Sequence, residues 1–262
     1  MLLRSEDCRF TVAGRHLAAR RLFPAAPAPV DAPTLVFLHE GLGAMTMWRD
    51  FPAQLVGRTG LPGLMYDRMG HGLSDPMDGP RRMGYLDREA GAFLPGLLAA
   101  AGVARPILVG HSDGGTIALL YAAMHPAAGV VSMAAHVFID AVSLAGLRTA
   151  RRAWETGDLK ARLARHHGDK TAAMFLAWND LWLTPRFASW QMLDRLPFID
   201  CPVLAMQGAE DEYGLPSQIE AIRDGVSGPA QALLLPDCAH IPHLQAPAAA
   251  LDAIAAFVET LR

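Results

Sequence analysis

At the centre of the chain stands the sequence Pro106-Ile107-Leu108-Val109-Gly110-His111-Ser112-Asp113-Gly114, followed by a helix-like segment over 115–124. The apolar residues at its start are typical of a strand buried on both faces. A strand that turns at once into a helix strains the residue at the turn, and flanking glycines leave room for it. We therefore expect the Ser112 hydroxyl at the carboxyl end of a strand, beside the positive end of a helix. A glycine-rich turn with an incidental serine would give the same pattern, so residues elsewhere must decide.

Apolar and helix-like segments alternate on both sides of this turn. The alternation predicts a parallel sheet with helices on both of its faces. We expect an opening hairpin from residues 10–12 and 17–22, further strands over 34–38, 64–66, 106–109, 130–133, 202–207 and 230–235, and helices over 50–58, 85–101 and 247–261.

One segment interrupts this alternation. Residues 139–197 contain helical patterns but no convincing strand, and they hold four of the five tryptophans. We expect a helical lid over the carboxyl edge of the sheet, inserted between core segments 1–138 and 198–262. The lid has nine Lys and Arg against six Asp and Glu. Such a basic lid favours anionic substrates, although a solvated helix surface would have the same composition.

Composition limits the classes of function. Hydrophobic residues make up 52% of the 262 residues, charged residues 19%, and the net charge is −3. These values favour one large buried core and give no sign of nucleic-acid binding. The three cysteines Cys8, Cys201 and Cys238 have no paired spacing, and neither a signal-peptide core nor a membrane span is visible. We expect a soluble cytoplasmic protein.

Two later loops supply partners that a serine nucleophile needs. A serine hydroxyl reacts only with a base in reach and a third group to orient that base. The strand predicted over 202–207 is followed by Glu210-Asp211-Glu212, and the strand over 230–235 by His240 and His243. The order Ser112, Asp211, His240 is the order expected for this architecture. Glu210 or Glu212 as the acid, and His243 as the base, remain alternatives.

These motifs together resemble the α/β-hydrolase fold family, in its lid-bearing esterase, lactonase and carbon–carbon hydrolase type. The resemblance covers nearly the whole chain. It implies that Asp211, three residues after Gly208, is the acid, and that His240 opens a segment similar to the family's H-x-P-H-x-x-x-P pattern. The turn over 67–74 resembles the family's D-x-R-G-x-G-x-S turn, with the arginine one place early, and its usual role is structural.

The resemblance also implies an oxyanion hole. One donor is expected to be the amide of Asp113, the residue after the nucleophile. The other comes from His39-Glu40-Gly41-Leu42-Gly43, where Glu40 interrupts the family's His-Gly pair. That insertion leaves two candidate amides, Leu42 and Gly41, of which we favour Leu42. We expect the Asp113 carboxylate to point away from the oxyanion and to bond donors in this loop.

Other side chains have competing roles. Trp178, Trp182, Trp190 and His39 are candidate substrate contacts, although packing is the alternative for each tryptophan. The adjacent His166 and His167 point in different directions along a helix, so we expect no metal site. Cys238 is expected to be a buried, inert thiol.

The sequence thus predicts a serine hydrolase that needs no cofactor and cleaves a small hydrophobic or aromatic carbonyl compound. Esters, lactones, vinylogous ketones and acyl-CoA thioesters all fit, and an anionic substrate is included. A cofactor-free peroxidase or lyase and a non-catalytic ligand receptor remain alternatives on the same scaffold. We expect no nucleic-acid or membrane partner, and a homodimer stays open.

Overall fold

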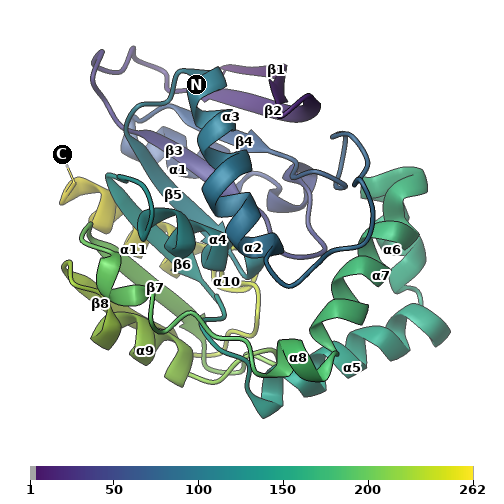
Figure 1. Ribbon diagram of the computed structural model, residues 1–262. Coiled ribbons are helices and arrows are strands. Elements are labelled where there is room, and N and C mark those ends of the chain that lie inside the picture. The colour runs from purple at the N-terminus through teal and green to yellow at the C-terminus, as the bar shows by residue number, and fades with distance from the viewer. Residues whose placement is uncertain (1–3, 262) are drawn as a thin grey trace.

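The computed structural model describes residues 4–261, and an eight-stranded sheet forms its centre (Figure 1). The strand order is β1-β2-β4-β3-β5-β6-β7-β8. β1 and β2 form an antiparallel hairpin, β2 pairs antiparallel with β4, and all other pairs are parallel. The strands are β1 (Arg4–Val12), β2 (Arg15–Phe23), β3 (Thr34–Leu38), β4 (Gly63–Tyr66), β5 (Pro106–His111), β6 (Gly129–Met133), β7 (Val203–Gly208) and β8 (Ala230–Leu235).

Helices cover both faces of the sheet, as the alternating pattern predicts. One face packs against α1 (Phe51–Thr59) and α11 (Pro247–Glu259), which also contact each other. The other face packs against α3 (Leu94–Ala101), α4 (Asp113–Ala122) and α9 (Ser217–Gly225). The central strands β3, β5, β6 and β7 are therefore almost wholly buried, which explains their continuous apolar sequence.

Residues 141–188 form no strand, as predicted for 139–197, but a 3₁₀ turn at Gly168–Lys170 and four α-helices. They are α5 (Ala141–Thr156), α6 (Leu159–His167), α7 (Thr171–Trp182) and α8 (Pro185–Ala188). Asp140 caps α5 by accepting from the Ser143 amide at 2.7 Å. Where the segment leaves and returns to the core, Phe138 and Gln191 form an isolated β-bridge. In Figure 1, α5, α6 and α7 lie together to one side of the sheet.

Most elements lie within a few residues of their expected positions, but the hairpin and one helix differ from the prediction. The hairpin strands are longer than expected, because their outer residues pair in register although they are polar. The helix expected over 85–101 is divided into α2 (Tyr85–Arg88), a π-helical turn at Glu89–Phe93, and α3. Met1–Leu3, part of the segment inspected for a signal peptide, and Arg262 lie outside the described residues. No helix within 4–261 has the length and apolarity needed to cross a bilayer.

Parallel strands bring their carboxyl ends to one edge of the sheet, and this edge positions the candidate site. β3 is followed by His39, β5 by Ser112 and β7 by the loop that contains Asp211. β8 leads into the loop that carries His240.

Candidate active site

Ser112 occupies a strained turn between β5 and α4. Its backbone has φ 53° and ψ −118°, a conformation that residues with side chains rarely adopt. The glycines on either side are required by close packing. A Cβ on Gly110 would collide with the Gly114 carbonyl, and one on Gly114 with the Leu38 carbonyl of β3. The turn therefore presents the serine side chain above the first turn of α4, as the sequence pattern predicts.

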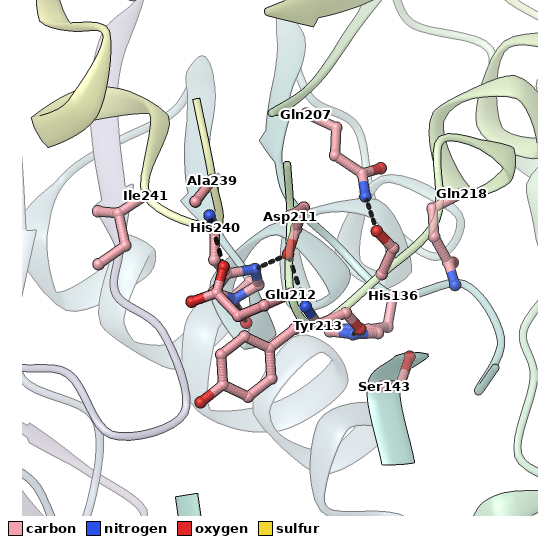
Figure 2. Close-up of polar contacts among 12 residues, drawn as sticks. His136, Ser143, Gln207, Asp211, Glu212, Tyr213, Gln218, Ala239, His240 and Ile241 are labelled. Carbon is pink, nitrogen blue, oxygen red and sulfur yellow. Dashed lines mark hydrogen bonds and ion pairs between the residues drawn. The ribbon is translucent and has the colours of Figure 1, made fainter. Parts of the chain in front are cut away.

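His240 lies between Ser112 and Asp211. Its Nε2 is 3.0 Å from Ser112 Oγ, and its Nδ1 is 2.8 Å from Asp211 Oδ1. Figure 2 shows the hydrogen bond between His240 and Asp211. An ionised carboxylate only accepts hydrogen bonds, so Nδ1 carries a proton and Nε2 is free to accept from the serine hydroxyl. The Asp211 side chain is 1% exposed, so water competes little for this hydrogen bond.

The two loops after β7 and β8 hold each other in place. The Tyr213 amide donates to Asp211 Oδ1 at 2.8 Å, and the His240 amide donates to Glu212 Oε2 at 3.2 Å. A Cβ on Gly208 would collide with backbone carbonyls of the β8 loop, so the loops need glycine there to approach this closely. Burial opposes ionisation of Asp211, but its hydrogen bonds to His240 and to the Tyr213 amide, with the electrostatic attraction of the histidine ring, outweigh burial and hold its pKa below the usual value.

The carboxylate of Asp113 is turned away from Ser112 into a buried cluster. Its Oδ2 accepts from the Tyr85 hydroxyl at 2.8 Å and from Arg68 Nη1 at 3.4 Å, and lies 3.6 Å from Arg81 Nη1. Tyr85 in turn accepts from Trp182 Nε1 at 2.8 Å. A chain of hydrogen bonds thus connects α7 with the residue after Ser112.

The loop 39–43 lies beside this cluster. Arg68 Nη2 donates to the Glu40 carbonyl at 2.7 Å, so one guanidinium contacts both this loop and Asp113. Glu40 Oε2 is 3.5 Å from His111 Nδ1; burial opposes its charge, but His111 outweighs burial and lowers the pKa of Glu40. Neither the Gly41 nor the Leu42 amide has a hydrogen-bond acceptor within residues 4–261. Both amides are available to a ligand.

A cavity of about 570 Å³ adjoins Ser112, between the sheet edge and helices α5, α6 and α7. Its lining includes both apolar side chains and arginines. The apolar side chains are Leu147, Leu159, Leu163, Trp178, Trp182 and Leu244, and the arginines are Arg49, Arg162 and Arg165.

Comparison with known proteins shows the family of this chain. The profile described as "Alpha/beta hydrolase family" matches residues 35–253. The chain belongs to the alpha/beta hydrolase family. This assignment confirms both the resemblance drawn from the motifs and the predicted fold class.

Individual relatives within this family are distant. The mouse (Mus musculus) sn-1-specific diacylglycerol lipase ABHD11 is 27% identical, over 96% of this chain and 90% of its own length. The enol-lactonase from Burkholderia xenovorans has a TM-score of 0.73 at 22% identity, over 96% of this chain and 100% of its own. The proline iminopeptidase of Mycobacterium smegmatis has a TM-score of 0.75 at 20% identity, over 98% of both chains. At such identities, these structures share the fold with this chain and say nothing of its substrate.

The structure brings most of the predicted site residues of this alpha/beta hydrolase to one place. Ser112, Asp211 and His240 form the hydrogen-bonded chain described above, and Asp113, Leu42, Gly41, Trp178 and Trp182 line the same cavity. The alternative acids and the alternative base considered from the sequence lie elsewhere or have other contacts. Glu210 is exposed, and Glu212 accepts only from the His240 backbone amide. His243 is buried against Trp48, with ring centroids 4.4 Å apart.

Two substrate-contact predictions are wrong. His39 is fully buried and does not line the cavity; its Nε2 accepts from the Arg68 amide at 3.0 Å and its Nδ1 donates to the Glu40 carbonyl. It fixes the loop instead. Trp190 stacks on Phe187, with ring centroids 5.7 Å apart, and also lies outside the cavity lining. A strand end and a tryptophan-rich segment indicate the neighbourhood of a site, but not which side chains turn towards it.

The expected partners of Asp113 are also wrong. Its carboxylate does point away from the oxyanion position, but its donors are Arg68 and Tyr85, with Arg81 as an ion-pair partner at 3.6 Å, rather than groups of loop 39–43. Arg81 precedes the helix predicted over 85–101 and Tyr85 only begins it, so no sequence pattern marks either residue as a partner of Asp113. An aspartate directly after the serine is the one signal that asks for buried donors nearby.

The paired histidines of α6 act separately. His166 Nδ1 is 2.7 Å from Thr46 Oγ1, whereas His167 accepts from the Gly72 amide and donates to the Leu42 carbonyl. All three bonds attach the C-terminal end of α6 to loops near the cavity. Cys238 is buried, and burial raises the pKa of its thiol, which makes it a poor nucleophile.

Proposed function

We propose that this protein is a serine hydrolase that cleaves a small hydrophobic carbonyl compound through an acyl-enzyme, without a cofactor. The observation that carries the proposal is the hydrogen-bonded chain Asp211–His240–Ser112 on a strained turn. Ser112 Oγ attacks the carbonyl carbon while its proton moves to His240 Nε2. Asp211 holds the other ring nitrogen and stabilises the imidazolium.

The remaining steps use the same groups. The imidazolium gives its proton to the leaving alcohol, thiol, enol or carbanion, and the acyl group stays on Ser112. Water then attacks the acyl-enzyme, with His240 taking one proton and returning it to Ser112 Oγ. The products are a carboxylic acid and the protonated leaving group, and the enzyme is regenerated.

The developing oxyanion needs donors that no protein group has taken. The Asp113 amide is in the first turn of α4, where helices leave amides without an internal acceptor. The Leu42 amide is the favoured second donor, with Gly41 as the alternative. A donor of this type contributes about 10²–10³ in rate.

The cavity supports an amphipathic substrate. Its leucine and tryptophan side chains suit an acyl chain or an aromatic ring, and Arg49, Arg162 and Arg165 suit an anionic group. Carboxylic esters, lactones and vinylogous ketones with these features are the main candidates. An acyl-CoA thioester is a second candidate because it joins an apolar chain to phosphates. Helices α5–α8 act as the lid over this site.

The test is a comparison of the wild-type protein with Ser112→Ala on a panel of esters, lactones, thioesters and dienoates. We expect measurable wild-type turnover of at least one activated short-chain ester, and less than about one hundredth of it in the variant. A Ser112→Ala protein with higher residual activity would contradict the proposal.

Two further readouts separate the alternatives. A pre-steady-state burst of leaving group indicates an acyl-enzyme and has no place in lyase chemistry. Covalent labelling of Ser112 by a fluorophosphonate is expected for an activated serine. A receptor that has lost catalysis would give neither burst nor label.

A further inference from the structure

The indole N–H of Trp178 is buried and lacks an acceptor. Trp178 is 7% exposed, and its Nε1 makes no hydrogen bond within residues 4–261. The neighbouring Trp182 of the same helix instead donates to the Tyr85 hydroxyl. A buried donor without a partner costs about 1–3 kcal/mol, so such groups are rare unless a ligand or water satisfies them.

This N–H lies beside the candidate oxyanion hole. Trp178 lines the cavity together with Ser112, and the position that a Cβ on Gly41 would occupy is 2.6 Å from Trp178 Nε1. The same position is 3.2 Å from Asp113 Oδ1. The indole nitrogen therefore approaches the junction of loop 39–43 and the turn that carries Ser112. Gly41 has no side chain where the indole needs the space.

The ring is held firmly in this place. Trp178 packs against Phe175 and Trp182 of α7, with ring centroids 6.1 Å away in both cases. Tyr85 fixes Trp182 by a hydrogen bond, so the neighbour of Trp178 is itself anchored. A rigid donor of this kind loses little conformational freedom when it binds an acceptor.

We propose that Trp178 Nε1–H donates a hydrogen bond to the oxygen of the substrate carbonyl, as a side-chain donor next to the amides of Asp113 and Leu42. This inference rests on the proposed function, because the acceptor is the oxygen that becomes negative when Ser112 attacks. A competing acceptor close to the same position is Asp113 Oδ1, whose sister oxygen Oδ2 already accepts from Arg68 and Tyr85. A bond to the substrate oxygen and a bond to Asp113 predict different effects of a Trp178 substitution on stability and rate.

The first experiment is Trp178→Phe, which removes the N–H and keeps an aromatic ring. We expect kcat on an activated ester to fall about 10²-fold, with KM changed less than threefold, because the bond strengthens in the transition state. The melting temperature should stay the same or rise, because an unpaired buried donor is removed. Trp190→Phe, which also removes one indole N–H from the same segment but outside the cavity, should change neither quantity.

Two results would overturn the assignment. One is a kcat of Trp178→Phe within twofold of the wild type. The other is a lower melting temperature together with a loss of activity that matches the loss of folded protein. This result is expected if the indole N–H bonds to Asp113 and only stabilises the fold.

A second readout does not need turnover. Phenylboronic acid adds to an active-site serine and mimics the tetrahedral intermediate. In a ¹H–¹⁵N spectrum, the indole signal that is missing in Trp178→Phe should move downfield when the acid is added to the wild type. An unmoved signal would refute the donor. A protein that hydrolyses no ester but shows the shift would refute the proposed reaction and still support the donor.

Discussion

At the scale of single residues, Asp211 determines which nitrogen of His240 carries the proton. Its Oδ1 accepts from Nδ1 at 2.8 Å, which leaves Nε2 to take the serine proton. Asp211→Asn keeps the shape but offers an amide that can favour the wrong tautomer. We expect kcat for ester hydrolysis to fall about 10⁴-fold, as is typical when the acid of such a triad becomes an amide.

Glu210→Gln is the matched control for this substitution. Glu210 is next to Asp211 but exposed, and it was an alternative acid on sequence grounds. Its kcat should equal that of the wild type. A large loss in Glu210→Gln with little loss in Asp211→Asn would reverse the assignment of the acid.

Several residues of the site could be placed from sequence because their positions follow from strand ends. Ser112, Asp211 and His240 each come shortly after a predicted strand, and parallel strands end at one edge. His39 also comes directly after a predicted strand, but its ring is buried and bonds to the backbone of Arg68 and Glu40. Position along a strand fixes the edge, whereas tertiary packing fixes the direction of the side chain.

At the scale of elements, Tyr85 connects three segments that are far apart in sequence. Its hydroxyl donates to Asp113 at the start of α4 and accepts from Trp182 of α7, while its own backbone begins α2. Tyr85→Phe leaves the Trp182 N–H without its acceptor and takes one donor from Asp113. We expect a loss of about 1–3 kcal/mol in the free energy of unfolding, measured by urea denaturation.

Tyr121→Phe is the control for this prediction. The Tyr121 hydroxyl makes no hydrogen bond to any described residue, so its removal should change stability by less than about 0.5 kcal/mol. Equal stability of the two variants would show that the Tyr85 hydroxyl contributes nothing to the connection.

The junction of α6 with the 3₁₀ turn Met45–Trp48 gives a prediction about substrate charge. Thr46 and His166 form a hydrogen bond across this junction. Arg49, shortly after Thr46, and Arg165, just before His166, line the cavity, and neither forms an ion pair within the described residues. Arg165→Gln should lower kcat/KM for an ester with a carboxylate in its alcohol part about tenfold. Hydrolysis of the neutral ester with the same acyl group should be unchanged, because only the charged group meets the arginine.

The salt dependence provides an independent check on this effect. The preference of the wild type for the anionic ester should decrease as ionic strength rises, because exposed charges are screened. If the wild type had no preference for the anionic ester, or if Arg165→Gln had the same preference, the arginines would be solvated surface residues with no role in substrate binding.

The same elements illustrate where sequence patterns are insufficient. The apolar face over 85–101 predicts one helix, and the π-helical turn at Glu89–Phe93 is invisible in it. That turn carries Glu89, whose carboxylate is buried near Arg68 and Arg81. Periodicity reports which face of a helix is apolar, but not the extra residue of a π-helical turn.

At the scale of the whole molecule, several histidines are buried. Within residues 4–261, burial as the first cause lowers the pKa of five: His39, His71, His136, His167 and His243. Nearby Arg68 adds to this effect at His39 and His71. These rings are neutral in the folded protein and regain an ordinary pKa near 6.5 when the chain unfolds.

This difference makes stability depend on pH in a defined direction. Below about pH 6.5 the unfolded chain binds protons that the folded chain does not, so the free energy of unfolding falls as pH falls. Glu89, whose pKa is raised by burial, opposes this by one proton at most, and Asp211, whose pKa is lowered, contributes only below about pH 4. We expect urea denaturation at pH 7.5, 6.5 and 5.5 to give a slope between the last two values steeper than the roughly 1.4 kcal/mol per pH unit of a single proton. A flat profile, or one that rises towards pH 5.5, would mean that these rings take up protons inside the folded protein, which their burial against Arg68 and one another opposes.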